Sequence, residues 1–187
     1  DAAQLDGLPD SALEQAKQAA EARELEGWLI TLDFPSFYAV MTYATDRALR
    51  EEVYTAFCTR ASDQGPNAGK LDNGPIIDEI LTLRQELAEL LGFANYAELS
   101  LATKMADSTD QVLGFLRDLG QRSKSYAEED LSALRAFAAE QGCSDLQPWD
   151  LGHYSEKLLQ HRYAISQEVL RPYFPVNTVI KGMFGIV

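Results

Sequence analysis

The residues most able to carry chemistry are concentrated in positions 148–163, which read PWDLGHYSEKLLQHRY. This stretch contains both histidines of the chain, His153 and His161, and Glu156 lies three residues after the first of them. Histidine and glutamate are common side chains for general acid–base catalysis and for zinc binding. If the chain holds an active site of its own, we expect it in this stretch.

The spacing of these side chains does not suit a zinc site. Pro148 favours the first turn of a helix, and on one straight helix His153 and His161 lie about 12 Å apart along the axis. Zinc needs its ligand atoms at about 2.0–2.3 Å, and helical zinc motifs place two histidines four residues apart. His153 and Glu156 alone supply two ligands, so a metal site of their own is a weak alternative. We expect His153 on a solvated face with Glu156, and His161 to be half buried.

Other types of active site find no support in the sequence. No serine lies in a GxSxG motif, and Cys58 is expected in the middle of a helix as a packed thiol. The glycine-containing loop at 62–74 matches neither GxGxxG nor GxxxxGK, so it does not predict a nucleotide site. We therefore assign no catalytic residue and no metal ligand within this chain.

The chain that positions these residues is predicted to be mostly α-helical, as a multi-helix array. Apolar residues recur at three- and four-residue spacing, in segments that begin near residues 10, 35, 46, 75, 95, 108 and 148. We treat residues 1–187 as a single partial helical region, with a loop at 62–74 and a long helix over about 108–141. In the helix that follows Asp46, the pairs Asp46–Arg50 and Arg47–Glu51 are expected on the outer face. The apolar stripe of the helix that begins at Pro75 is expected to be core.

Residues 28–32 interrupt the helical pattern. Their sequence, WLITL, is typical of a β-strand and is bounded by Gly27 and Pro35. One strand cannot satisfy its own backbone groups, and no second convincing strand follows. The sequence therefore predicts one short strand whose partner is missing from this chain.

Composition narrows the possible partners and the compartment. The chain has 187 residues, 46% of them hydrophobic, and a formal net charge of -13. An acidic surface repels nucleic acids and anionic membranes, so neither is an expected partner. The two cysteines show no disulfide-like spacing, which favours a reducing compartment, and we expect a cytoplasmic protein.

The two ends of the sequence suggest a piece of a longer polypeptide. The chain starts at Asp1 without a methionine and ends within the apolar run VIKGMFGIV. Helical spacing places the apolar residues of this run on one face, namely Val179, Ile180, Met183, Phe184 and Val187. We expect this 179–187 face to lack its cover and to support self-association.

Four blocks of the sequence resemble a known family. They are DRALREEVYTAFCTRAS at 46–62, DNGPIIDEILTLRQELAELLGFANYAELSLATKMA at 72–106, PWDLGHYSEKLLQHRY at 148–163 and LRPYFP at 170–175. In this order they resemble successive blocks of the thimet oligopeptidase family of zinc metallopeptidases, and the resemblance spans essentially the whole chain. It implies a larger, two-lobed helical peptidase with a deep channel that admits short peptides.

The resemblance also implies what this chain does not contain. The family carries zinc on an HExxH helix with a further carboxylate ligand, and the residue after His153 is Tyr154. The chain resembles the part upstream of that helix, so it is expected to be a non-catalytic middle segment with no cofactor of its own. Zinc belongs to the parent enzyme, whose missing remainder is an expected partner of this segment.

By analogy with the family, four residues are candidates for the channel wall or for contacts between lobes. They are Trp149, Tyr154, Arg171 and Tyr173. Ordinary packing is the competing interpretation for all four, because aromatic residues on helices are mostly core. The competing function is a stand-alone helical binding or scaffold module without enzymatic activity.

Overall fold

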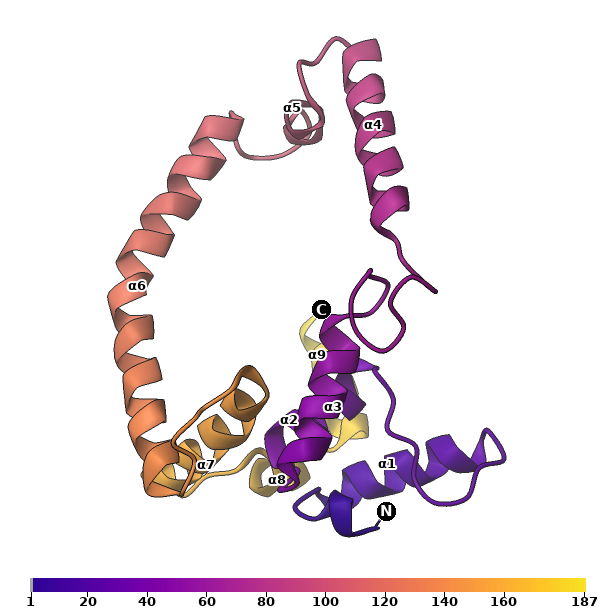
Figure 1. Cartoon of the computed structure of the whole chain (residues 1–187). Coiled ribbons are helices and arrows are strands. Elements are labelled where there is room, and N and C mark those ends of the chain that lie inside the picture. Colours follow the sequence, from indigo (N-terminus) through magenta and orange to yellow (C-terminus); the bar gives the residue numbers. More distant parts are fainter. Residues whose placement is uncertain (1) are drawn as a thin grey trace. The chain divides into compact units, whose positions relative to one another are not determined.

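The computed structural model describes residues 2–187, except for the side chains of Gln167 and Glu168. Within this part of the chain every regular element is helical (Figure 1). The α-helices are α1 (Asp10–Glu21), α2 (Phe34–Tyr43), α3 (Arg47–Cys58), α4 (Gly74–Leu90), α5 (Tyr96–Leu101), α6 (Thr109–Glu140), α7 (Leu151–Tyr163), α8 (Gln167–Leu170) and α9 (Val176–Ile186). Three short 3₁₀ helices accompany them: η1 (Ala2–Leu5), η2 (Pro148–Asp150) and η3 (Arg171–Tyr173). Among the described helices, none combines the length and the apolar character of a membrane-spanning segment.

The chain forms two compact units, and the first is built from two separate stretches of sequence. Unit 1 contains residues 1–57 and 134–187, and unit 2 contains residues 58–133. In unit 1, α2 packs against both α1 and α7. A core cluster forms around these helices, and its buried members are Leu5, Leu8, Val40, Met41, Ala44 and Val53.

Gly152 makes the close contact between α2 and α7 possible. A Cβ atom at this position would lie 3.1 Å from the carbonyl oxygen of Met41, which is tighter than most real Cβ contacts. The missing side chain therefore lets the backbones of the two helices approach each other. This contact fixes the first turn of α7 on the last turn of α2.

The predicted strand at 28–32 is wrong, because the described residues contain no strand. The segment has no regular secondary structure, and its backbone is satisfied in part by helices instead of a second strand. The Leu29 N–H donates to the Ala16 carbonyl of α1 at 2.9 Å, and the Thr31 N–H donates to the Ser36 hydroxyl of α2 at 3.0 Å. Ile30 and Leu32 pack partly buried against the core cluster. Strand-type residues are thus used here to line a helical core.

Unit 2 contains α4, α5 and most of α6. Asn95 caps α5, since its side chain accepts a hydrogen bond from the Glu98 N–H at 3.0 Å. Gly92 ends α4 with a φ of 83°, and the Phe93 N–H closes the last turn onto the Ala88 carbonyl. Figure 1 draws α6 as one uninterrupted ribbon. Its observed bounds, Thr109–Glu140, lie within one residue of the predicted range of 108–141 at each end.

The apolar stripe of α4 was expected to be core, but its members are exposed in the described chain. Ile76 is 52% exposed and Leu83 is 55% exposed, while Ala88 is the buried residue of the helix. Cys58 also differs from expectation. It is the last residue of α3 and is exposed, so it is not a packed thiol in mid-helix.

The C-terminal apolar residues form the helix α9, as the spacing predicts. Their face is open in the structure, with Val179 48%, Met183 50% and Phe184 69% exposed. Whether this face supports self-association stays a prediction.

Candidate functional site

Residues 148–163, which contain both histidines, start with a hydrogen-bonded turn. Gln147 and Asp150 form a capping box around η2, in which the Gln147 N–H donates to the Asp150 carboxylate at 3.1 Å. Pro148 occupies the first position of η2, where its missing N–H costs no hydrogen bond. The turn leads directly into α7, and it places Asp150 inside unit 1.

Asp150 is the centre of a charged cluster. Arg47 donates to both of its oxygens, from Nε at 3.2 and 3.0 Å and from Nη2 at 2.7 Å, and Arg50 donates from Nη2 at 2.8 Å. The side chains of Asp150 and Arg50 are 0% and 2% exposed, whereas that of Arg47 is 47% exposed. We call Arg47, Arg50 and Asp150 the arginine–aspartate cluster. It joins α3 to the start of α7.

The pKa of Asp150 lies below its ordinary value. Burial alone raises this pKa, but hydrogen bonds from Arg47, Arg50 and the Gln147 backbone outweigh burial and lower it. The carboxylate therefore stays ionised at neutral pH, and all of its hydrogen bonds go to groups of the protein. Such a carboxylate neither accepts a proton from a substrate nor binds a metal, so the cluster is structural.

Arg50 also holds the end of α2. Its Nη1 donates to the carbonyl oxygens of Ala44 at 2.7 Å and Thr45 at 3.2 Å, which follow the last turn of α2. The carbonyl groups at a helix C-terminus have no partner within the helix, and a cation is favourable there. The predicted surface pair of Asp46 with Arg50 is wrong for this reason. Asp46 instead caps α3, and its carboxylate accepts hydrogen bonds from the backbone of Ala48 and Leu49.

His153 lies in the same interface and is buried, contrary to the expected solvated position. Its Nδ1 lies 3.2 Å from the Thr42 carbonyl oxygen, another group of the last turn of α2, to which the neutral ring donates. Burial, together with the positive charges of Arg50 and Lys157, lowers the pKa of His153 to about 4. The ring is therefore neutral near pH 7, and its Nδ1 proton is bonded to the Thr42 carbonyl group.

The predicted exposure of Glu156 and the predicted burial of His161, the other acid–base residues of α7, are also wrong. Glu156 is buried, and it accepts a hydrogen bond from Gln160 at 2.9 Å. His161, expected to be half buried, is exposed, with its ring 5.4 Å from that of Phe137. In the described part of the chain, no group of three or more histidine, cysteine, aspartate or glutamate side chains has the geometry to hold a metal ion. The residues present do not fit a zinc site.

Two of the four candidate wall residues belong to the packing of α7 and η2. Trp149 is half buried against the core cluster, with its ring 6.0 Å from that of Tyr54. Tyr154 is half buried, packs edge-on against His153 at 5.3 Å and lies under the Lys157 ammonium at 5.7 Å. Burial raises the pKa of the Tyr154 hydroxyl, and a hydrogen bond with Cys143 adds to this effect.

The other two candidates lie in η3. Arg171 donates to the Ser11 hydroxyl of α1 and lines a hollow of about 280 Å³ with Tyr38 and Tyr43. Tyr173 is 78% exposed. The structure therefore does not bring the four candidates together at one site.

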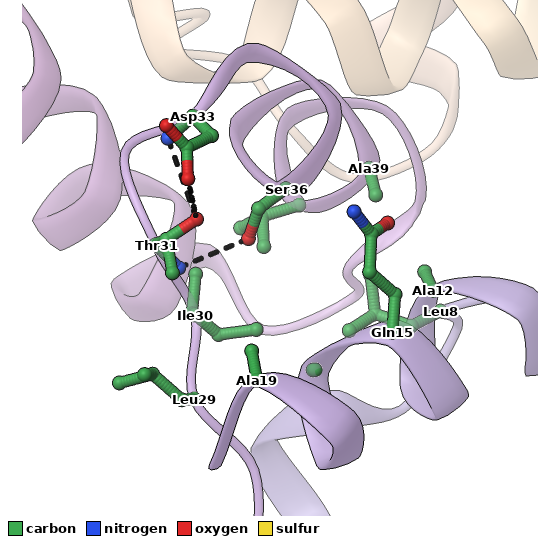
Figure 2. Close-up of a pocket in the computed structure, with 12 residues that line it drawn as sticks. Leu8, Ala12, Gln15, Ala19, Leu29, Ile30, Thr31, Asp33, Ser36 and Ala39 are labelled. Atoms are coloured by element: carbon green, nitrogen blue, oxygen red, sulfur yellow. Dashed lines mark hydrogen bonds between the residues drawn. The ribbon is translucent and has the colours of Figure 1, made fainter. Parts of the chain in front are cut away.

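A smaller pocket lies between α1, α2 and the 28–32 segment (Figure 2). Its volume is about 100 Å³, and most of its lining is apolar, with Ala12, Ala16 and Ala19 on α1 and Ala39 and Val40 on α2. Among its polar residues, Thr31 donates its N–H to the Ser36 hydroxyl and its own hydroxyl to the Asp33 carboxylate, as Figure 2 shows. Gln15 also lines the pocket. The lining contains no histidine, lysine or arginine beside the Thr31–Asp33 pair.

Comparison with known proteins shows the family to which the interface of α2, α3 and α7 belongs. The family model described as "Peptidase family M3" matches residues 40–187. The chain belongs to peptidase family M3. The matched region includes the arginine–aspartate cluster, α7 and α9, so the contacts within that cluster lie inside the region that the family model matches.

Three bacterial relatives within family M3 match closely. Oligopeptidase A of Salmonella typhimurium and that of Escherichia coli are each 60% identical over 188 residues, and oligopeptidase A of Haemophilus influenzae is 56% identical over 186 residues. These matches cover 100%, 100% and 99% of this chain. The chain spans only 28%, 28% and 27% of the length of these relatives.

The arginine–aspartate cluster was missed by reasoning from the sequence, although one signal pointed to it. Arg50 and Val53 are three residues apart, on the face of α3 that is buried. A cation in an apolar position of an amphipathic helix requires a buried anion. The sequence contains many acidic residues, and nothing local identifies Asp150 as that anion.

Proposed function

We propose that this chain is a non-catalytic segment of a zinc-dependent oligopeptidase of the oligopeptidase A type, which cleaves short peptides in a deep channel. The observation that carries the proposal is the 60% identity to oligopeptidase A over the full length of this chain, combined with coverage of only 28% of that relative. Such identity extends over residues that do no chemistry here, which is expected if they build the frame of the same enzyme.

The zinc ion of the proposed enzyme requires ligands outside this sequence. The chain has two histidines, His153 is buried against a carbonyl group, and no HExxH motif is present. Zinc in such enzymes polarises the scissile carbonyl and activates water. In the proposed enzyme none of these roles falls to residues 1–187.

The contribution we propose for this segment is rigidity of the channel wall. A channel selects short peptides only if its walls do not yield to a larger substrate. The arginine–aspartate cluster and the contact of His153 with Thr42 join α2, α3 and α7 through buried polar bonds, which have strict geometry. Trp149 and Tyr154 belong to this packed layer, whereas Tyr173 is exposed and available to peptides or to another lobe. Arg171 is also exposed, and it donates to the Ser11 hydroxyl of α1.

The proposed compartment is the cytoplasm. Both cysteines are free thiols, Cys58 exposed and Cys143 half buried. Exposed thiols persist in a reducing environment.

The full-length protein tests the proposal. We expect it to contain about one zinc ion per chain, measured by atomic emission, and to cleave short peptides while leaving folded proteins intact. A zinc chelator should abolish cleavage, and added zinc should restore it. Peptide cleavage that resists the chelator, or a full-length protein without zinc and without cleavage, would contradict the proposal.

A simpler comparison distinguishes the proposed enzyme from the competing function, a stand-alone scaffold module. The intact mass of the natural protein is measured against the reading frame that encodes it. A frame that continues past Val187 into an HExxH motif excludes the scaffold module. A natural protein that ends at Val187 excludes the proposed enzyme.

A further inference from the structure

The 28–32 segment, which the sequence predicted to be a strand, has one edge whose N–H groups are bonded to helices and one edge whose N–H groups are not. Leu29 and Thr31 direct their N–H groups to α1 and α2, at 2.9 and 3.0 Å. Trp28 and Ile30, the alternate residues, have no hydrogen-bond partner for N–H or C=O among the described residues. Figure 2 shows the Leu29 and Ile30 side chains leaving the backbone on different sides. Alternation of this kind is the geometry of a β-strand.

A hollow lies beside the open edge. It has a volume of about 280 Å³ and is lined by Gln4, Leu5, Glu26, Gly27, Trp28, Ile30 and Leu49. Its walls are mainly apolar, and Trp28 is 42% exposed there. At Gly27 an added Cβ would meet nothing within 4 Å, so space is open at this end of the hollow. The open hydrogen-bonding groups and the apolar hollow therefore belong to the same two residues, Trp28 and Ile30.

We propose that Trp28–Ile30 is a docking edge, to which an extended segment from the remainder of the same polypeptide adds as a β-strand. The N–H and C=O groups of Trp28 and Ile30 pair with the backbone of that segment, and its apolar side chains fill the hollow. An unpaired edge with strand-type residues is a ready template for such pairing. This inference rests on the proposed function in one respect, namely that the chain is part of a longer polypeptide.

The choice of occupant follows from the length of the relatives and from the nature of the edge. The chain spans 28% of the Salmonella relative, so most of such a polypeptide lies outside these residues. A segment of the same polypeptide docks at a high effective concentration and stays bound. A segment that stays bound would keep Ile30 buried, and Ile30 already packs against the core cluster. A peptide substrate, by contrast, needs a nucleophile or a metal site beside its backbone. The lining of this hollow contains one carboxylate, that of Glu26, and no histidine, cysteine, serine or threonine.

The test is amide hydrogen exchange of the full-length protein, followed residue by residue by NMR with labelled Trp28, Leu29, Ile30 and Thr31. We expect the Ile30 amide to exchange at least about a hundredfold more slowly than an unstructured amide, as Leu29 and Thr31 do through their bonds to helices. Fast exchange at Ile30 beside slow exchange at Leu29 and Thr31 would overturn the proposal. Fast exchange at all three residues would also overturn it.

A pair of variants checks that the hollow is occupied. Glu26→Trp places a bulky side chain at the rim of the hollow and should accelerate Ile30 exchange at least about tenfold while leaving Leu29 unchanged. Glu21→Trp is the matched control, because Glu21 is an exposed residue of α1 outside the hollow. It should change the exchange rate of neither Ile30 nor Leu29. Equal rates in both variants would contradict docking at this hollow.

Two further measurements distinguish the docking edge from a substrate site and from the proposed function. If Ile30 is protected only when a short peptide is added in excess, the edge binds substrate and the proposal fails. Zinc content and chelator-sensitive peptide cleavage are measured on the same sample. Cleavage with an unprotected Ile30 leaves the proposed function standing without the docking edge. A protected Ile30 without zinc or cleavage leaves the docking edge standing without the proposed function.

Discussion

Asp150 and Arg50 form an ion pair of 2.8 Å in which both side chains are excluded from solvent. The two residues are separated by 100 positions in the sequence. A buried ion pair contributes little net stability relative to an apolar pair, but removal of one partner leaves an uncompensated charge in the interior. The pair therefore specifies how α3 and α7 meet more than it strengthens their contact.

Replacement of Asp150 by asparagine tests this pair. The variant removes the negative charge and leaves the Arg50 guanidinium buried without its anion, so we expect a loss of about 3–5 kcal/mol in the free energy of unfolding. Urea titration followed by circular dichroism measures this change. Asp118→Asn is the matched control, because the pair of Asp118 with Arg122 is exposed on α6 and should contribute less than about 0.5 kcal/mol. Equal losses in the two variants would contradict a structural role for Asp150.

The stability of unit 1 should depend on pH through His153. The pKa falls from 6.5 to about 4 in the folded protein. Between these values the unfolded chain binds a proton that the folded chain does not, so stability declines as the pH falls from about 6.5 to about 4. The total loss is about 3 kcal/mol. His153→Gln should remove most of this pH dependence, whereas His161→Gln, at an exposed position, should retain it. Thermal unfolding measured from pH 4 to 7 tests both variants, and an unchanged slope in His153→Gln would contradict the assignment.

Two helical glycines should respond in opposite directions to alanine. Gly152→Ala places a Cβ 3.1 Å from the Met41 carbonyl oxygen and should separate α7 from α2, at a cost of about 1–3 kcal/mol. Gly114→Ala, in α6, meets nothing within 4 Å and should stabilise the helix by about 0.5–1 kcal/mol. The melting temperatures of the two variants measure this difference. A stabilised Gly152→Ala would show that the close approach of the helices is not required.

The open apolar face of α9 should make the 187-residue chain associate with itself. Phe184 is 69% exposed on this face, and large apolar patches favour partners. We expect the apparent mass from light scattering to rise with protein concentration, and Phe184→Glu to suppress the rise. Tyr126→Glu, at a 70% exposed position of α6, is the control and should not suppress it. A monomer at all concentrations would refute this prediction.

Local features of the fold were predictable from the sequence, because neighbouring residues determine them. Asp46 caps α3, Asn95 caps α5 and Gly92 ends α4, and each of these roles depends on atoms within a few residues. The predicted helices followed from the same short-range patterns. The predicted strand at 28–32 was wrong because the N–H groups of this segment bond to a helix carbonyl and a serine hydroxyl. The residue types of the segment do not indicate such partners.

The interface of α2 with α7 was not predictable for a different reason. The residues that α7 buries, His153 and Glu156, are polar, and hydrophobic periodicity therefore assigns them to the surface. His153 and Arg50 are buried because the last carbonyl groups of α2 need donors. That need arises only when α2 and α7 meet, and no pattern within either helix predicts the meeting.

The two-part construction of unit 1 has a consequence for the time course of synthesis. Thr42 and His153 are separated by 111 positions, and ribosomes add about 5–20 residues per second. The last turn of α2 must therefore wait roughly 5–20 s for the donor that satisfies it. During that interval residues 58–133 emerge and can fold as unit 2. A nascent chain stalled before α7 would therefore expose the incomplete core of unit 1.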